Sequence, residues 1–151
     1  MKKKMVSALL TATMVCGMSV VPAVGVAAAD DTITVGFSQV GAESDWRTAN
    51  SESMKSTFSE KNGYKLIFDD AQQKQENQIT AIRNFIQQEV DYILLAPVTE
   101  TGWDTVLQEA KDADIPVIIV DRMVDVSDDS LYTTWIGTDS LLSLIHISEP
   151  T

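Results

Sequence analysis

The chain has 151 residues, of which 44% are hydrophobic and 22% charged, a composition typical of a folded domain and unlike disordered or collagen-like chains. Its 22 acidic residues outnumber 11 basic ones, and the net charge of −11 argues against a nucleic-acid partner, because phosphate binding requires a basic face. With one cysteine and one histidine, the sequence excludes an internal disulfide, a CxxC site and a multi-histidine metal site.

Residues 1–29 have the pattern of a secretory signal peptide. Three lysines follow the initial methionine, a largely apolar run extends through residue 21, and three alanines at 27–29 suit cleavage. An uncleaved membrane anchor and a lipoprotein acylated at Cys16 are the alternatives, and the small residues at the end of the run favour cleavage. We therefore expect a mature chain that is exported to the periplasm or the outer cell surface.

Residues 32–139 alternate short apolar runs with amphipathic segments. The expected strands are 32–37, 64–68, 92–96, 116–120 and 133–136, and the expected helices are 44–62, 73–89 and 101–113. Thr101, three residues before Asp104, is the expected N-cap of the third helix, and the Gln, Lys and Glu residues of the second are expected to face water. Strands joined through helices predict an α/β fold, with a parallel sheet and helices on both faces.

The end of the chain has a different character. Residues 142–151, LSLIHISEPT, match a translation of a sequencing-library adapter end, so we expect 140–151 to be a non-native tail and the domain to cover 30–139. A native apolar helix start is the alternative. On the first interpretation the natural protein is longer, and His146 has no functional role.

Polar side chains follow four of the five expected strands, and Pro97 and Val98 follow the third, at the strand ends where ligands of parallel sheets bind. Carboxylates, guanidinium groups and hydroxyls suit a polyhydroxylated ligand, because each sugar hydroxyl both donates and accepts hydrogen bonds. An indole ring would cover the apolar face of such a sugar. The candidate ligand-binding residues are Ser38, Glu43, Trp46, Arg47, Asp70, Asp121, Arg122 and Asp139.

Several acidic candidates have a structural alternative. Asp69 and Asp70 are equally suited to capping the next helix. Asp121 and Arg122 could form an ordinary surface ion pair, although adjacent opposite charges directly after an apolar strand favour a site.

The three tryptophans divide between packing and binding. Trp46, at the start of the first helix, either fills the core or stacks on a ligand. Trp103 is expected to pack in the core, and Trp135 to lie in the core or against a second lobe.

An enzyme is not expected from these residues. The sequence has no GxGxxG or GxxxxGK[ST] phosphate loop and no GxSxG nucleophile elbow, and the mature part has no cysteine. We therefore assign no catalytic residue, no cofactor and no metal, and a flavodoxin-like enzyme is the less favoured alternative.

Several blocks of this sequence carry a family resemblance. They are Val35-Gly36-Phe37-Ser38, the turn 69–72, the helix 75–86, the strand and proline 92–98, residues 110–117 and the pair Asp121-Arg122. Together they resemble the N-terminal lobe of type I periplasmic sugar-binding proteins of ABC importers. Residues 41–47 and 101–104 are most similar to galactofuranose-binding members.

The resemblance implies that Trp46, Arg47, Asp121 and Arg122 contact sugar, and that Ser38, Glu43 and Asp70 line the pocket. It implies a two-lobed clamshell that captures a monosaccharide such as galactofuranose, galactose or ribose and delivers it to a membrane permease, monomeric at full length. A sugar-sensing protein for a chemoreceptor or sensor kinase is the alternative. Because the second lobe is missing from this sequence, we expect the fragment to bind sugar weakly and to be poorly soluble.

Overall fold

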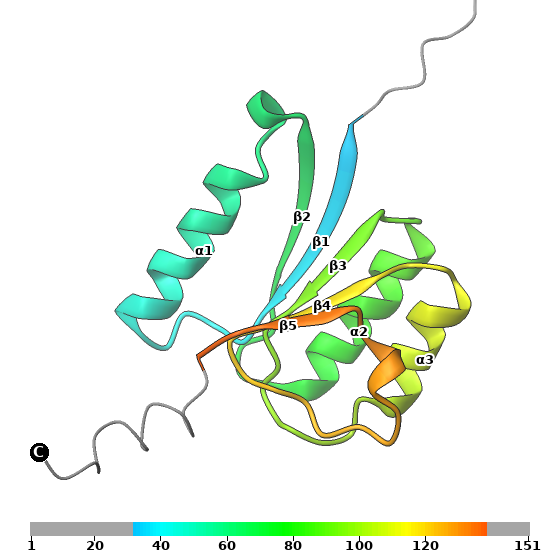
Figure 1. The fold of residues 1–151 in the computed structure, drawn as a ribbon. Helices are drawn as coiled ribbons and strands as arrows, with labels where there is room; N and C mark the ends of the chain where they lie inside the picture. Colours follow the sequence, from blue (N-terminus) through cyan, green and yellow to red (C-terminus); the bar gives the residue numbers. More distant parts are fainter. Residues whose placement is uncertain (1–31, 139–151) are drawn as a thin grey trace, which may run out of the picture.

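Five parallel strands form one sheet, in the order β2-β1-β3-β4-β5 (Figure 1). The computed structural model describes residues 32–138, so the expected leader, Asp139 and the expected tail lie outside the described residues. The strands are β1 Ile33–Gln39, β2 Tyr64–Asp70, β3 Tyr92–Leu95, β4 Val117–Val120 and β5 Thr134–Ile136; the helices are α1 Asp45–Thr57, α2 Gln75–Gln87 and α3 Asp104–Asp112, with 3₁₀ turns η1 Glu60–Asn62 and η2 Asp129–Leu131.

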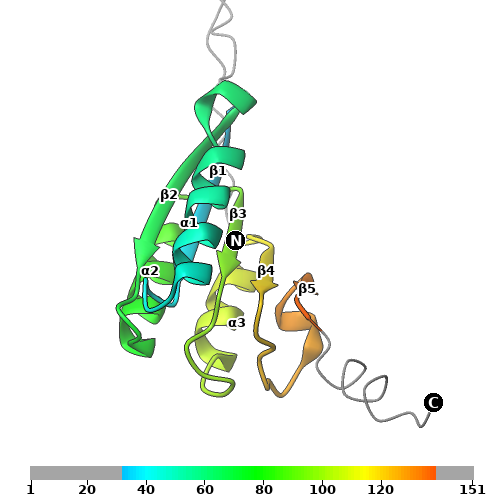
Figure 2. The same cartoon turned by 90° about the vertical axis from the view of Figure 1, so that its left-hand side faces the viewer.

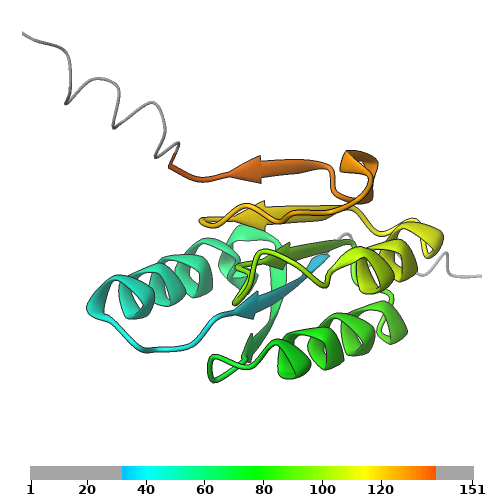
Figure 3. The ribbon, with the colours of Figure 1, turned by 90° about the horizontal axis from the view of Figure 1, so that it is seen from below.

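Helices cover both faces of the sheet. Figure 2 and Figure 3 show α1 on one side and the packed pair α2 and α3 on the other. Each face has its own apolar core, one including Phe37 and Leu94 on the α1 side and one including Ile93 and Phe85 on the α2 side. The predicted α/β fold, with a parallel sheet between helices, is confirmed, and no helix among residues 32–138 is long and apolar enough to cross a membrane.

Two of the three inner strands, β3 and β4, explain why the prediction from composition worked. In β3 and β4, nearly every residue is buried, because helices or loops lie on both faces of the sheet there. Parallel strands buried on both sides are continuous apolar runs rather than alternating ones.

Gly36 of β1 lets the sheet and α2 approach closely. A Cβ atom at this position would lie 2.5 Å from the Phe85 Cγ atom, which is well inside van der Waals contact. Val35 and Phe37 point to the opposite face, into the α1-side core. Glycine at position 36 therefore sets the distance between β1 and α2.

Three details of the helices differ from the prediction. α1 ends at Thr57 and is followed by η1, which Gly63 closes with a φ of 82°, so the predicted single helix 44–62 is two elements. The predicted Thr101 cap is wrong: Trp103 is the N-cap residue of α3, and its side chain makes no capping bond. Instead the Thr101 carbonyl accepts a hydrogen bond from Gln75 Nε2 at 2.7 Å.

Gln78 is the third difference. The helix was expected to turn its glutamines to water, but Gln78 is fully buried. Its Nε2 donates to the Ala96 carbonyl at 2.7 Å, and its Oε1 accepts from the Val98 backbone N–H at 2.8 Å. The side chain satisfies the backbone where β3 ends, and so fixes the loop on the carboxyl side of the sheet.

Candidate functional site

Arg47 is the centre of the candidate site. It lies in the first turn of α1, and only 4% of its side chain is exposed. Its Nε donates to Glu43 Oε1 at 3.0 Å, and its Nη2 donates to Asp121 Oδ2 at 2.6 Å. A buried guanidinium requires such partners, because an unpaired charge in the interior is strongly unfavourable. The pairs join the loop after β1 to the residue after β4.

The start of α1 places Arg47 and Trp46 side by side. Ser44 is the N-cap residue, and its side chain accepts a hydrogen bond from the Arg47 backbone N–H at 3.2 Å. Trp46 is 55% exposed, and the Arg47 guanidinium carbon lies 4.9 Å from the centroid of its ring. An open indole face therefore stands beside a buried cation, at the carboxyl end of the sheet.

One nitrogen of the Arg47 guanidinium, with its two N–H donors, has no partner in the described part of the chain. The Nη1 atom is buried and has no hydrogen-bond partner among the described residues. Leaving a buried donor unpaired costs about 1–3 kcal/mol, and more where the group is charged. This nitrogen therefore keeps hydrogen-bonding capacity that the described residues do not satisfy.

Asp121 has an unusual backbone. It follows β4 with a φ of +70°, the left-handed region, which non-glycine residues seldom adopt. Such strain often occurs at functional sites. The predicted alternative for this residue, an ion pair with Arg122, is wrong, because its carboxylate pairs with Arg47. Arg122 is exposed, and its Nη1 donates to the Val98 carbonyl at 3.3 Å.

Asp70 lies at the end of β2 and forms a turn. Its Oδ1 accepts from the Gln72 backbone N–H at 2.9 Å. The capping alternative is wrong for this pair of aspartates, since the N-cap residue of α2 is Lys74 and no side chain caps the helix. Burial, and then the charge of Asp70, raise the pKa of the Asp69 carboxyl. Both aspartates belong to β2 rather than to the loop after it.

Ser38 lies apart from the Arg47 group. It is fully buried inside β1, opposite Asp69 of β2. Because side chains alternate along a strand, Ser38 shares the α2 side of the sheet with Gly36, whereas Arg47 starts the helix on the other side. The Ser38 hydroxyl and the Asp69 Oδ1 are both buried without a partner in the described part of the chain.

The structure thus brings together four of the eight candidates. Glu43, Trp46, Arg47 and Asp121 form one connected group. Asp70 lies at the carboxyl end of β2 and Arg122 follows the carboxyl end of β4, and each makes a hydrogen bond to the backbone of a loop residue. Asp139 is outside the described residues.

One contributor to the site was not among the candidates. Trp135 of β5 is half-buried and packs against the α3-side core, as its expected core role requires. Its indole Nε1 also donates to the Asp121 carbonyl at 3.1 Å. Only the pairing of β4 with β5 brings these residues together, so no local sequence signal could have revealed the contact.

Comparison with known proteins identifies the family of this chain. The sequence model of the family described as periplasmic binding protein domain matches residues 35–142. The chain belongs to this family. Of the periplasmic binding proteins, the galactofuranose-binding protein YtfQ of Escherichia coli is 56% identical over 110 residues, covering 73% of this chain and 34% of YtfQ.

Two solved periplasmic binding proteins are similar as well. The arabinose-transporter component from Shewanella sp. ANA-3, bound to L-arabinofuranose, is 61% identical with a TM-score of 0.68, and the match covers 70% of this chain and 35% of that one. A Mycobacterium smegmatis protein in complex with β-D-fucofuranose is 60% identical with a TM-score of 0.68, covering 71% and 35%. The chain thus spans about a third of the length of these relatives.

Proposed function

We propose that this chain is the first lobe of an exported solute-binding protein that captures a monosaccharide for an ABC importer, with a five-membered-ring sugar as its ligand. The observation that carries the proposal is the buried Arg47, fixed by Glu43 and Asp121 with one donor unused, beside the exposed ring of Trp46. The protein acts in the periplasm or at the outer cell surface, and it is a binder rather than an enzyme.

Each part of this group has a role toward a sugar. The Arg47 Nη1 donates to a ring or hydroxyl oxygen, because a guanidinium carries hydrogen-bond donors and no acceptor. Glu43 and Asp121 each bind Arg47 through one oxygen, and the second oxygen of a carboxylate accepts a sugar hydroxyl. Trp46 covers the C–H face of the ring. Arg122 lies at the same edge of the sheet, and Asp139, outside the described residues, stays a candidate from the sequence.

The relatives favour the furanose form. At 56% to 61% identity, the compared proteins are described as binding galactofuranose, L-arabinofuranose and β-D-fucofuranose. The sugars differ in their substituents and share the five-membered ring. Residues of the first lobe, which are similar among these proteins, would therefore recognise the ring form.

The complete protein is a clamshell in this proposal. The described lobe supplies one wall of the pocket, and a second lobe closes over the sugar before the closed form meets the membrane permease. The complete protein is a monomer. Sequencing through codon 139 in the source genome gives the full reading frame, and that gene product is the protein to assay; if the frame stops after Thr151, the 151-residue product is assayed.

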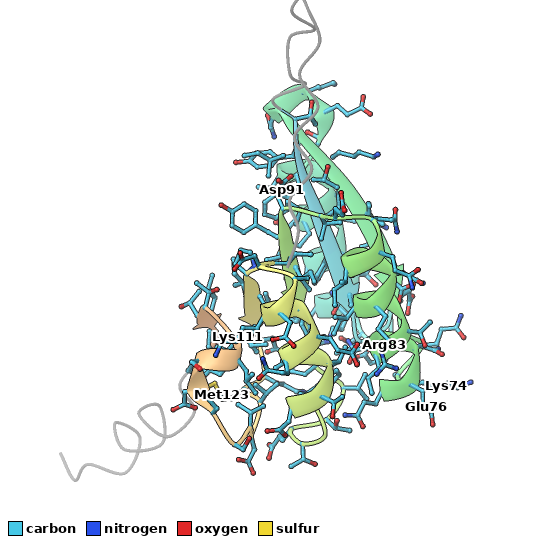
Figure 4. All side chains as sticks on the ribbon, turned by 90° about the vertical axis from the view of Figure 1, so that its right-hand side faces the viewer. Lys74, Glu76, Arg83, Asp91, Lys111 and Met123 are labelled. Carbon is cyan, nitrogen blue, oxygen red and sulfur yellow. The ribbon has the colours of Figure 1, made fainter. Side chains whose placement is uncertain are left out.

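Calorimetry with a panel of furanose-forming and pyranose-only sugars tests the proposal. Arg47→Met should weaken binding of the best sugar about 10- to 100-fold, because hydrogen bonds from a charged donor contribute about 1.5–3 kcal/mol. Arg83→Met is the matched control: Arg83 lies on the outer side of α2, paired with Glu109 at 2.7 Å, and should bind as the wild type does (Figure 4). No saturable binding to any sugar, or equal losses in the two variants, would contradict the proposal.

A further inference from the structure

The backbone of Asp121 is held on both sides by β5. Its N–H donates to the Ile136 carbonyl at 2.8 Å, and its carbonyl accepts from the Trp135 indole at 3.1 Å. We infer that the segment Trp135-Ile136-Gly137 is a positioning device that fixes Asp121, and through it Arg47, in the geometry that binds ligand. Trp135 acts through Asp121 in this role and is not itself a ligand contact.

The need for such a device comes from the conformation of Asp121. A left-handed φ is unfavourable for a residue with a side chain, and it persists only where the surroundings fix it. Here both polar groups of the backbone unit are satisfied by one short strand. If the indole N–H were removed, the carbonyl of Asp121 would lose its partner, and the left-handed turn would lose one of its two anchors.

Gly137 is required for the same arrangement. A Cβ atom there would lie 2.2 Å from the Asp121 carbonyl oxygen and 2.6 Å from the Trp135 Nε1, the two atoms that the hydrogen bond joins. The absence of a side chain at 137 leaves room for the indole to reach the carbonyl.

The segment 135–137 is connected to the candidate site through Asp121. The Asp121 carboxylate accepts a hydrogen bond from Arg47 Nη2 at 2.6 Å, so a shift of the Asp121 backbone moves or breaks this bond. The direction of the unused Nη1 depends on how the other nitrogens of the planar guanidinium are held. Trp135 therefore acts through Asp121 and Arg47 to position the Nη1 donor that is offered to the ligand.

Trp135→Phe removes the indole N–H and keeps an aromatic ring in the core. Trp103→Phe is the matched control, because Trp103 donates the same kind of bond, to the Thr99 carbonyl at 2.8 Å, from a fully buried position at the start of α3. Two readouts on the full chain are compared: hydrogen exchange of the Arg47 guanidinium protons by NMR, without sugar, and the dissociation constant for the best sugar of the panel.

Trp135→Phe should speed the Arg47 exchange about fivefold or more and weaken sugar binding by a similar factor, as expected for one hydrogen bond. Trp103→Phe should lower the melting temperature at least as much and change neither readout. Unchanged Arg47 exchange in Trp135→Phe, or the same acceleration in Trp103→Phe, would overturn the inference.

The two proposals can fail separately. The binding readout rests on the proposed function, whereas the exchange readout does not: faster Arg47 exchange in a protein that binds no sugar would retain the positioning role and reject the sugar. If Trp135→Phe does not fold, the wild type decides. Its Trp135 indole proton should be protected from exchange like that of Trp103, and rapid exchange at Trp135 would refute the hydrogen bond on which the inference depends.

Discussion

Adding a single methyl group at Gly36 should destabilise the fold measurably. The Cβ atom of an alanine would lie 2.5, 2.7 and 2.9 Å from three ring carbons of Phe85, where ordinary contacts are 3.4–4 Å. The nearest of these is the Cγ atom at the root of the ring, and Phe85 is itself buried in the core, so the ring can move aside only with α2. Overpacking of this kind costs about 1–3 kcal/mol, and the depth of the clash places Gly36→Ala at about 2–3 kcal/mol.

Urea unfolding of the mature chain measures this cost. Domains of this size are stable by about 5–15 kcal/mol, so the expected loss moves the midpoint well beyond experimental error. Gly41→Ala is the matched control, since a Cβ atom there would lie 3.0 Å from Glu43 Oε2, at the end of a side chain, and 3.4 Å from Gln73 Cγ; it should cost less than about 1 kcal/mol.

A double-mutant cycle with Phe85→Leu identifies the clash itself. The smaller side chain leaves room for the alanine methyl, so the double variant should be about 1–2 kcal/mol more stable than the two single losses together predict. Additive losses, or a Gly36→Ala chain as stable as the wild type, would refute the argument that this glycine sets the distance between β1 and α2.

Three further expectations follow from individual residues. Glu89 and Asp114 directly follow the C-cap residues of α2 and α3 and have φ of 52° and 60°. Glu89→Gly and Asp114→Gly should each raise the free energy of unfolding by about 0.5–1 kcal/mol, measured from the urea midpoint. A loss of stability would contradict the strain assigned to these two residues. Burial raises the pKa of Asp69 in the folded chain, so the free energy of unfolding falls as the pH rises from the unfolded-state pKa to the folded-state pKa. Asp69→Asn should therefore raise the melting temperature at pH 7 but not at pH 3. Equal shifts of the melting temperature at both pH values would argue against a raised pKa at Asp69. Ile136 on the edge strand β5 is 62% exposed, so Ile136→Thr should raise the solubility of the 151-residue chain. Light scattering as a function of protein concentration measures this change. Unchanged scattering would mean that aggregation involves another surface.

The fold was predictable because its signals are local. The strands β3 and β4 are apolar runs, as a doubly covered parallel sheet requires, and α2 and α3 have clear apolar faces. The errors came where tertiary contacts replaced local rules. Gln78 lies on the same face as Ile82 and Phe85, at a spacing of four and seven residues, so its burial was visible in the periodicity; its partners Ala96 and Val98 were not.

The location of the candidate site was predictable from the sequence, whereas the grouping of its side chains was predictable only in part. The rule that ligands bind at the carboxyl ends of parallel strands selected Glu43, Arg47 and Asp121 without any coordinates. The rule treats a strand end as one location, and so it also selected Ser38, whose side chain lies on the other face of the sheet. A ligand prediction from strand ends improves when the alternation of side chains along each strand is applied to its last residues.

Two unfavourable features lie together at the carboxyl edge of the sheet, although left-handed φ angles also occur at its opposite edge, at Glu89 and Asp114. The left-handed Asp121 and the buried, unpaired Nη1 of Arg47 both lie at the carboxyl ends of the strands. At the opposite end of the strands, Asp91 makes two hydrogen bonds to the backbone of Thr34 in β1. Its Oδ2 accepts from the Thr34 N–H at 2.7 Å, and its own N–H donates to the Thr34 carbonyl at 2.9 Å. A chain selected for stability alone has no reason to keep strain and an unpaired donor together. Their coincidence beside an exposed indole is what the proposed sugar site would require, because a bound ligand would supply the missing partner and recover part of that cost.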